Sequence, residues 1–246
     1  MSRMSRREDA VEDLSHPEPQ VGAPVRVPEH VETPRRAPYE GRYVRLEPVD
    51  AEGDAPALYA CSHGDPAAER LWTYLPYGPF ARVADMEAWL RKCAASADTL
   101  FLTVHDLAGG RPVGMAAFLN VVPDALRLEL GHIWYGPAAQ RTRANTEAAY
   151  LMLREAFDHL GYRRAEWKCD SLNERSRAAA LRLGFRYEGT FRQHMVRKGR
   201  NRDTAWFSML DGEWPTVRAD IERWLYDNAD GSMSLTALNA GVSGER

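Results

Sequence analysis

The chain has 246 residues, 44% of them apolar, and a formal net charge of −3 at pH 7. This length and composition suit one core with some additional tail, and the low, mixed charge does not favour nucleic acid or an anionic membrane as a partner. The cysteines, Cys61, Cys93 and Cys169, form no C-x-x-C pair, and no apolar run reaches about 18 residues, which argues against a disulfide framework, a zinc site and a membrane span.

Residues 1–38 contain six of the fifteen prolines and no aromatic side chain. Such a segment buries too little apolar surface to offset its ordering entropy, so we expect a disordered N-terminal tail, with a docking arm as the alternative. One folded domain is expected over residues 39–228, followed by a loose C-terminal tail over 229–246. The charged N-terminus is not a signal peptide, and we expect a cytoplasmic protein without a metal.

The first part of the domain predicts a strand over 43–48, a short helix near 55–62 and a helix over 83–97. Between the two helices lies the sequence LWTYLPYGPF, which places Trp72, Tyr74 and Tyr77 among prolines and a glycine. Aromatic residues in such a loop can line a pocket or clamp the loop onto the core. We therefore treat these three residues as candidates for binding the substrate.

The middle of the chain predicts two strands, 100–105 and 113–122, joined by a hairpin turn, and then a strand over 127–135. In this last strand the apolar positions change from Leu128 and Leu130 to Ile133 and Tyr135. Because side chains alternate along a strand, such a change of phase needs an inserted residue. The sequence therefore predicts a β-bulge at Gly131 and His132.

A long amphipathic helix follows and ends at Gly161, with a polar entrance over 140–145. Thr142 stands where its hydroxyl can cap free amides, and Arg141 and Arg143 lie where the helix dipole already favours negative charge. This entrance suits a phosphate or a pyrophosphate. A capped core helix with solvated arginines is the alternative.

The last part predicts a strand over 164–169, parallel to the bulged strand because a helix connects the two. Asn173 can cap a helix over 174–183, which Gly184 ends. A hairpin formed by 185–192 and 204–210 around a basic turn, and a helix over 214–226, complete the domain. The basic turn could contact an acidic acceptor, the 3′-phosphate of coenzyme A or RNA, or be solvated.

This order of elements, together with Asn173-x-x-Ser176, Leu183-Gly184-Phe185 and Glu188-Gly189, resembles the GNAT superfamily of N-acetyltransferases. More narrowly, it resembles the branch with the ribosomal-protein-alanine acetyltransferases. The resemblance implies an α/β (α+β) fold with a mixed, mostly antiparallel central sheet, a bulged and splayed strand pair and flanking helices. It also implies transfer of an acetyl group from acetyl-CoA to a primary amine, of a small molecule or a protein N-terminus, by direct attack.

The resemblance also assigns roles to residues. Strand amides near Ile133 and Trp134 would bond the pantetheine arm and polarise the thioester, and Ser176 would donate a proton to the departing thiolate. The structural alternative for Ser176 is a small residue bonded to its own helix. Glu129 or His132 would be the general base, and His194 is a less favoured candidate. The candidate cofactor-binding residues are Ile133, Trp134, Gln140, Arg141, Thr142, Arg143, Ala144, Asn145, Thr146 and Asn173.

Two departures from the family pattern leave other functions open. Arg143 and Asn145 occupy the usual glycine positions of the cofactor turn, and Ala180 occupies the position of the usual acidic tyrosine. The alternatives are a transferase for a larger acyl-CoA such as succinyl-CoA, and a CoA-sensing or protein-binding module that catalyses no acyl transfer. The sequence does not identify the amine acceptor, and it leaves a homodimer open.

Overall fold

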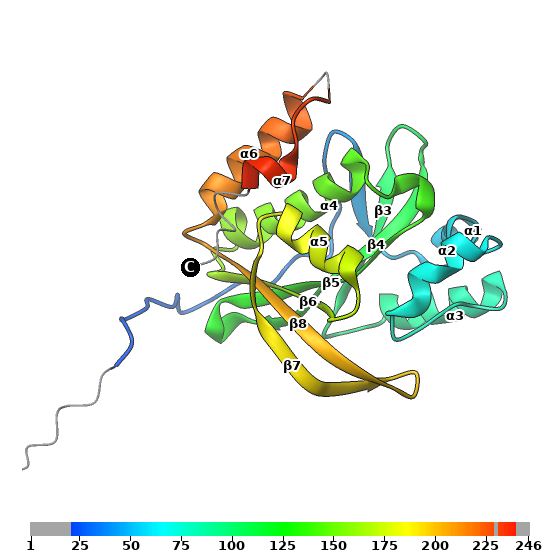
Figure 1. The fold of residues 1–246 in the computed structure, drawn as a ribbon, viewed down its shortest axis with the longest axis horizontal. Coiled ribbons are helices and arrows are strands. Elements are labelled where there is room, and N and C mark those ends of the chain that lie inside the picture. Colours follow the sequence, from blue (N-terminus) through cyan, green and yellow to red (C-terminus); the bar gives the residue numbers. More distant parts are fainter. Residues whose placement is uncertain (1–20, 229–230, 240–246) are drawn as a thin grey trace, which may run out of the picture.

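The computed structural model describes residues 21–228 and 231–239, which form an open, eight-stranded sheet flanked by helices (Figure 1). The strand order is β1-β2-β3-β4-β5-β6-β8-β7. Neighbouring strands run antiparallel except β5 and β6, which are parallel. The predicted fold class and the parallel crossover through the central helix are therefore confirmed.

The strands are β1 (Tyr39–Glu40), β2 (Val44–Pro48), β3 (Leu100–Asp106), β4 (Arg111–Val122), β5 (Arg127–Tyr135), β6 (Arg164–Asp170), β7 (Arg186–Arg197) and β8 (Arg200–Leu210). The α-helices are α1 (Ala51–Ser62), α2 (Pro66–Glu69), α3 (Val83–Ala94), α4 (Arg143–Arg154), α5 (Glu174–Arg182), α6 (Trp214–Tyr226) and α7 (Leu235–Asn239). Short 3₁₀ turns cover Arg70–Thr73, Pro123–Ala125 and Pro137–Ala139, and a π-helical turn, η4 (Glu155–His159), extends α4.

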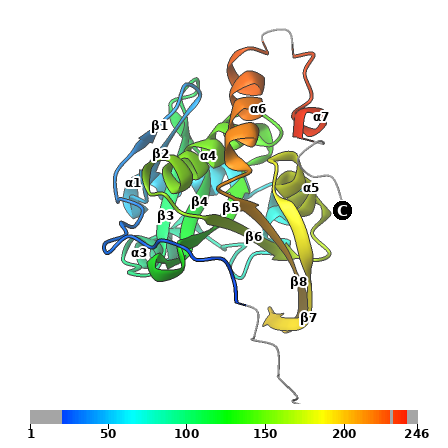
Figure 2. The same ribbon diagram turned by 90° about the vertical axis from the view of Figure 1, so that its left-hand side faces the viewer.

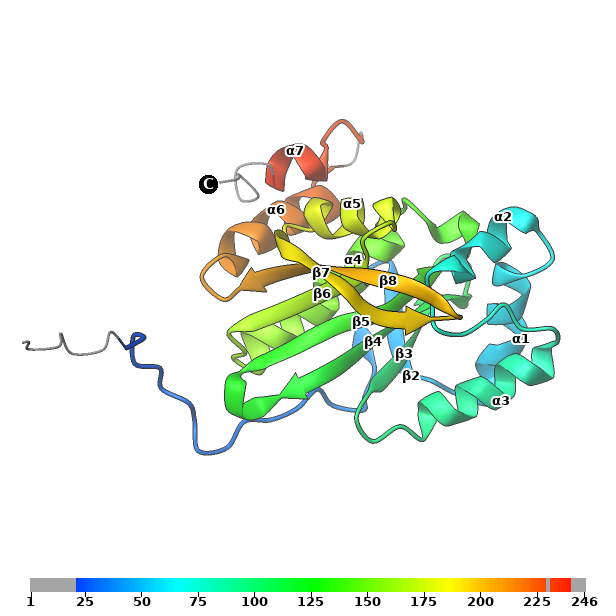
Figure 3. The ribbon, with the colours of Figure 1, turned by 60° about the horizontal axis from the view of Figure 1, so that its bottom comes forward.

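Two hydrophobic clusters divide the core between the faces of the sheet. The larger one joins β2–β6 and β8 to α4, α5 and α6, with Phe118, Leu128, Met152 and Phe207 almost fully buried. The smaller one lies on the opposite face, where α1 and α3 cover the first strands (Figure 3). Helices therefore cover both faces near β2–β4, whereas on the β6–β8 side α4, α5 and α6 cover one face only.

Several element boundaries follow from local caps. Helix α1 begins earlier than predicted, at Ala51, because the Asp50 carboxylate accepts a hydrogen bond from the amide of Glu52. Asn173 caps α5 as predicted, its side chain accepting from the amide of Ser176 at 3.1 Å. The long central helix ends at Gly161, whose φ of +67° suits glycine.

The C-terminal hairpin is longer than predicted. Its strands β7 and β8 continue to a two-residue turn, Lys198-Gly199, in which both residues have positive φ, 47° and 71°. Positive φ at both central positions is typical of a type I′ turn, which matches the twist of paired strands. The basic residues predicted to lie in a loop therefore lie mostly on the strands of this hairpin.

Both ends of the chain make contacts with the domain. The carbonyl of Glu32 accepts from the Tyr162 hydroxyl at 3.2 Å, and the guanidinium of Arg36 donates to the carbonyls of Ala94 and Ser96 at the end of α3. At the other end, helix α7 packs against α5 and α6, and its Leu235 is buried. The remaining residues of the two segments expected to be tails, 1–20, 229–230 and 240–246, lie outside the described residues.

Candidate active site

The predicted bulge opens the centre of the sheet. In the pairing of β4 with β5, Ala117 lies opposite Gly131 and Met115 opposite Trp134, so two residues of β5 face a single residue of β4. His132, one of the two, has a φ of +51°, in the left-handed region. On the other side, the pairing of β5 with β6 stops at Leu130. Beyond this point the two parallel strands separate, and β5 has an unpaired edge.

The entrance of α4 carries main-chain amides without acceptors. The first amides of a helix have no intrahelical partner, and at this helix they belong to residues 142–145. Thr142 stands at the N-cap position, but its hydroxyl donates to the carbonyl of Ala139 at 2.8 Å, so the predicted capping by its side chain is wrong. Within the part of the chain that the structure describes, no other side chain caps these amides. Together with the helix dipole they form an anion-binding end.

The side chain of Arg143 points away from this end. Its guanidinium donates to the Tyr43 hydroxyl at 3.2 Å and to the carbonyl of Asn228, and it lies over the Tyr43 ring. Tyr43 lies just before β2 and Asn228 just after α6, two elements that lie beside α4 (Figure 2). The guanidinium of Arg143 therefore makes a structural contact, whereas its main-chain amide remains at the helix entrance.

Other side chains hold the entrance in place. Gln140 donates to the carbonyl of Tyr135 at 2.9 Å, which ties the turn to the end of β5, and Arg141 has a φ of +60°. Arg182 of α5 reaches Asn145 and Thr146 with hydrogen bonds of 2.9 and 2.8 Å. Sequence analysis missed Arg182, because helical periodicity does not tell which neighbouring helix a surface arginine will reach.

Ser176 lies at the point where β5 and β6 separate. Its Oγ accepts a hydrogen bond of 3.0 Å from the indole N–H of Trp167, the residue of β6 that pairs with Leu130. This partner is a strand residue, and not the helix carbonyl of the structural alternative. Ser176 also lies next to Cys169. Burial raises the pKa of the Cys169 thiol, and a hydrogen bond with the Ser176 side chain partly lowers it again.

On the opposite face of the sheet, His132 packs among aromatic side chains. Its Nδ1 lies 3.2 Å from the Tyr77 hydroxyl, and the ring centroids of His132 and Phe101 are 4.8 Å apart. Burial and, to a smaller extent, the positive charge of Arg197 lower the pKa of His132 to about 4. The imidazole is therefore neutral near pH 7, and the structure brings two of the predicted site residues, His132 and Tyr77, together.

Glu129, on the same face, belongs to a buried ionic cluster. Its carboxylate lies 2.9 Å from the ammonium of Lys168 and accepts a hydrogen bond of 2.6 Å from Asn120. Lys168 lies equally close to Glu166 and stands 3.8 Å above the ring of Trp206. The Glu129 carboxylate is therefore already engaged by an ammonium and an amide group.

Trp72 and Tyr74 hold the aromatic loop to the protein. Trp72 is almost fully buried, donates to the carbonyl of Ser62 at 3.2 Å and packs against Trp134. Tyr74 donates to the carbonyl of Leu172 at 3.1 Å, which joins the loop to the segment before α5. Of the aromatic residues proposed to contact the substrate, these two have structural partners, whereas Tyr77 lies next to the bulge.

His194, the least favoured of the proposed bases, lies 3.0 Å from the Thr204 hydroxyl and packs near Phe191 and Trp206 on the hairpin.

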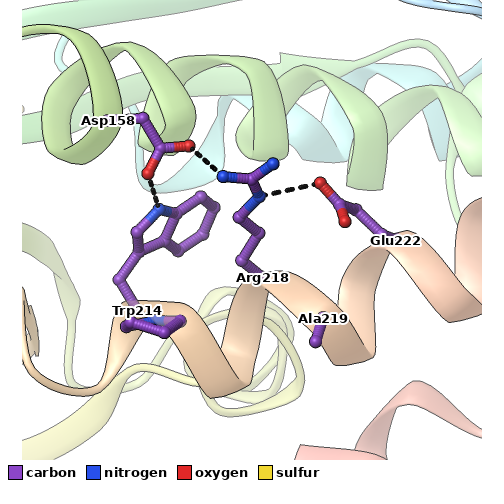
Figure 4. A pocket seen from close by; sticks show the side chains of 6 residues that line it. Asp158, Trp214, Arg218, Ala219 and Glu222 are labelled. Atoms are coloured by element: carbon purple, nitrogen blue, oxygen red, sulfur yellow. Dashed lines mark hydrogen bonds and ion pairs between the residues drawn. The ribbon is translucent and has the colours of Figure 1, made fainter.

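A separate surface groove lies between η4 and α6 (Figure 4). There Asp158 accepts from Trp214 and Arg218, and Arg218 also bonds Glu222. Because these polar groups satisfy one another, the groove has the character of a structural contact between two helices.

Comparisons with known proteins give the family of this chain. Residues 44–186 match the family model described as "Acetyltransferase (GNAT) domain". The chain belongs to the GNAT family of acetyltransferases. A curated relative, "Putative ribosomal N-acetyltransferase YdaF" of Bacillus subtilis (strain 168), is 29% identical over 175 residues, which cover 69% of this chain and 90% of that protein.

Solved structures of the family share the fold. A GCN5-related N-acetyltransferase from Brucella melitensis is 45% identical with a TM-score of 0.81, over 85% of this chain and 96% of that one. A protein from Chromobacterium violaceum ATCC 12472, described as one of the "probable acetyltransferases (GNAT family)", is 40% identical with a TM-score of 0.72, over 80% of this chain and 100% of that one. The described helices include none long and apolar enough to cross a membrane, and the described residues contain no cluster of acidic, histidine and cysteine side chains suited to a metal ion.

Proposed function

We propose that this GNAT acetyltransferase transfers an acetyl group from acetyl-CoA to a primary amine by direct attack of the amine. The observation that supports this proposal best is the separation of β5 and β6 beside the acceptor-free amides at the start of α4. An unpaired strand edge and an anion-binding helix end, close together, suit a ligand that has both an amide-bearing arm and a pyrophosphate. Acetyl-CoA is such a ligand, and it supplies an activated acetyl group.

The main chain would do most of the binding. The amides of β5 near Ile133 and Trp134 would bond the pantetheine arm and polarise the thioester carbonyl. The amides of residues 142–145 would bind the pyrophosphate, so the arginine and asparagine at the usual glycine positions do not by themselves prevent binding. The side-chain oxygen of Asn173 caps α5, which leaves the side-chain nitrogen free to donate to the pantetheine arm.

Ser176 would protonate the departing thiolate. Its oxygen accepts the N–H of Trp167, so its own proton can be donated. The same N–H stabilises negative charge on the oxygen while the proton leaves. Trp167 would therefore support Ser176 as a positioning residue, without touching the reacting atoms.

His132 suits the role of general base better than Glu129 does. It is neutral near pH 7 and bonds Tyr77 beside the bulge, whereas the Glu129 carboxylate is held by Lys168 and Asn120. A base with such a low pKa is weak, so we expect the ammonium form of the substrate to lose its proton to solvent before attack. His132, bonded to Tyr77, would then accept the second proton that the amine releases as it attacks. Their position on the face opposite to α4 and α5 also separates the amine from the cofactor entrance.

The test is the release of free CoA thiol from acetyl-CoA and succinyl-CoA with a panel of amines that includes peptides with a free N-terminus. A peptide belongs in this panel because of the name of the Bacillus relative. We expect turnover with acetyl-CoA. Faster turnover with succinyl-CoA would favour the larger acyl donor, and CoA binding without any thiol release would favour a non-catalytic module.

Within this assay, Ser176→Ala should lower kcat by about 10²-fold or more while the Kd for acetyl-CoA changes little, because proton donation matters mainly as the thiolate leaves. Trp167→Phe, which keeps the ring and removes the N–H, should have a smaller effect in the same direction. Ser171→Ala, a serine in the turn before α5, is the control. An unchanged kcat in Ser176→Ala, with chemistry shown to be rate-limiting, would assign Ser176 a structural role.

A further inference from the structure

The β7–β8 hairpin brings unpaired positive charge to the side of the sheet opposite the cofactor entrance. Arg202 of β8 is half-buried, and its Nε is buried without a hydrogen-bond partner. Among the described residues, its guanidinium forms no ion pair within 4.0 Å. The charged groups that act on it are Asp170, Glu129 and Arg197. Glu129 is already paired with Lys168, and Asp170 accepts from the amide of Leu172 at 2.9 Å.

Two further cations stand at the tip of the same hairpin. Among the described residues, the guanidinium of Arg197 donates a hydrogen bond to the sulfur of Met195, at 3.2 Å, and forms no ion pair within 4.0 Å. Lys198 donates to the carbonyls of Trp72 and Gly78 at 2.8 and 2.7 Å. Both residues are exposed, and neither has a carboxylate partner within the described part of the chain.

These charges face the end of the site that would receive the amine. The hydrogen bonds of Lys198 attach the tip of the hairpin to the loop that carries Tyr77 (Figure 3), and the charge of Arg197 acts on His132. Trp206 pairs directly with Lys168, and side chains alternate along a strand, so Arg202 lies on the same face as Lys168 and Glu129.

We propose that the amine acceptor carries a carboxylate, which binds to the guanidinium of Arg202 between β5 and the β7–β8 hairpin. This inference rests on the proposed acetyl transfer. A carboxylate would supply the missing partner of Arg202 with paired N–H···O hydrogen bonds, and Arg197 and Lys198 would add attraction at the mouth of the site. The same charges disfavour polyamines and other polycationic acceptors, which lack a carboxylate.

The test compares ω-amino acids with one to five methylene groups, each with its matching amide, as acceptors for acetyl-CoA. In the wild type, kcat/KM should be about tenfold to a hundredfold higher for the best acid than for its amide, the range of one charge-assisted contact. Arg202→Gln should remove this preference, mainly by raising KM for the acid much more than KM for the amide. Arg192→Gln is the matched control, because Arg192 lines a crevice with Asp203 on the opposite face of the hairpin and its loss changes the net charge equally.

Binding of the N-acetylated products in the presence of CoA, measured by calorimetry, separates this inference from the proposed function. Tighter binding of the acid product than of its amide, lost in Arg202→Gln alone, supports the carboxylate site even if no amine is acetylated. Equal use of acids and amides, or equal effects of Arg202→Gln and Arg192→Gln, would overturn the inference while acetyl transfer stands. The absence of both turnover and acid-selective product binding would overturn both.

Discussion

Glu147 holds helix α4 to the start of the sheet, and its replacement by glutamine should be strongly destabilising. The side chain has no exposed surface and accepts hydrogen bonds from the main-chain amides of Arg42, Tyr43 and Val44 at 2.9, 2.6 and 2.8 Å. Its Oε1 also accepts from the Tyr226 hydroxyl at 2.8 Å. A carboxylate suits this position because all four neighbours donate.

The expected cost follows from these contacts. In Glu147→Gln, the best orientation places the amide nitrogen in the position of Oε1, where the Tyr226 hydroxyl can turn to accept but the Arg42 amide loses its partner. An unsatisfied buried amide costs about 1–3 kcal/mol, and the two remaining bonds lose their charge assistance at about 1 kcal/mol each. The free energy of unfolding should therefore fall by roughly 3–5 kcal/mol.

Equilibrium unfolding in urea, followed by tryptophan fluorescence, measures this loss. Tyr226→Phe removes a single donor and should cost about 1–2 kcal/mol, so it provides a measurable variant if Glu147→Gln does not fold. Hydrogen exchange should report faster opening of the amides of residues 42–44 in both variants. A Glu147→Gln protein within 1 kcal/mol of the wild type would refute the reasoning.

Arg143→Ala should leave the Kd for CoA within about threefold and lower the free energy of unfolding by about 1–2 kcal/mol, because the guanidinium bonds Tyr43 and a carbonyl. Calorimetry measures the first effect and urea unfolding the second. A much larger loss of CoA affinity would contradict this prediction. Burial lowers the pKa of His132 to about 4, so the unfolded chain, with a histidine pKa of about 6.5, binds more protons between these values. Stability should therefore fall by about 3 kcal/mol as the pH drops from about 6.5 to about 4, and a His132→Gln protein with the same pH dependence would argue against this origin. A chain that starts at Tyr39 should be less stable than one that starts at Val21 by about 1–3 kcal/mol, because it lacks the contacts of Glu32 and Arg36; equal thermal unfolding temperatures would show that these contacts add nothing.

The local pattern of the sequence was enough to predict the centre of the fold. The change of phase across Gly131 and His132 predicted the bulge, and the glycine at 161 and the asparagine at 173 marked helix ends that the structure confirms. These features depend on the steric and hydrogen-bonding properties of a few consecutive residues. The parallel pairing of β5 and β6 followed as well, because a helical connection between two neighbouring strands restricts their direction.

The hairpin shows where local pattern fails. The segment VRKGRNRD is polar and basic, which predicts a loop, yet most of it extends β7 and β8. Each strand is stabilised by pairing with the other, and the partner lies at the far side of a turn whose geometry the sequence suggests only weakly. Pairing with a neighbour can therefore outweigh a low strand propensity.

The directions of the charged side chains were decided by the tertiary structure alone. By its position in the sequence, Arg143 could point to a phosphate or to solvent. Its actual direction depends on Tyr43 and Asn228, which are 100 and 85 residues away along the chain. The burial of Glu147 and the unpaired state of Arg202 arise in the same way, because a charge is satisfied or left unsatisfied by groups that only folding brings within reach. The sequence thus determined the elements and the family, whereas the contacts of the charged groups at the site required the folded chain.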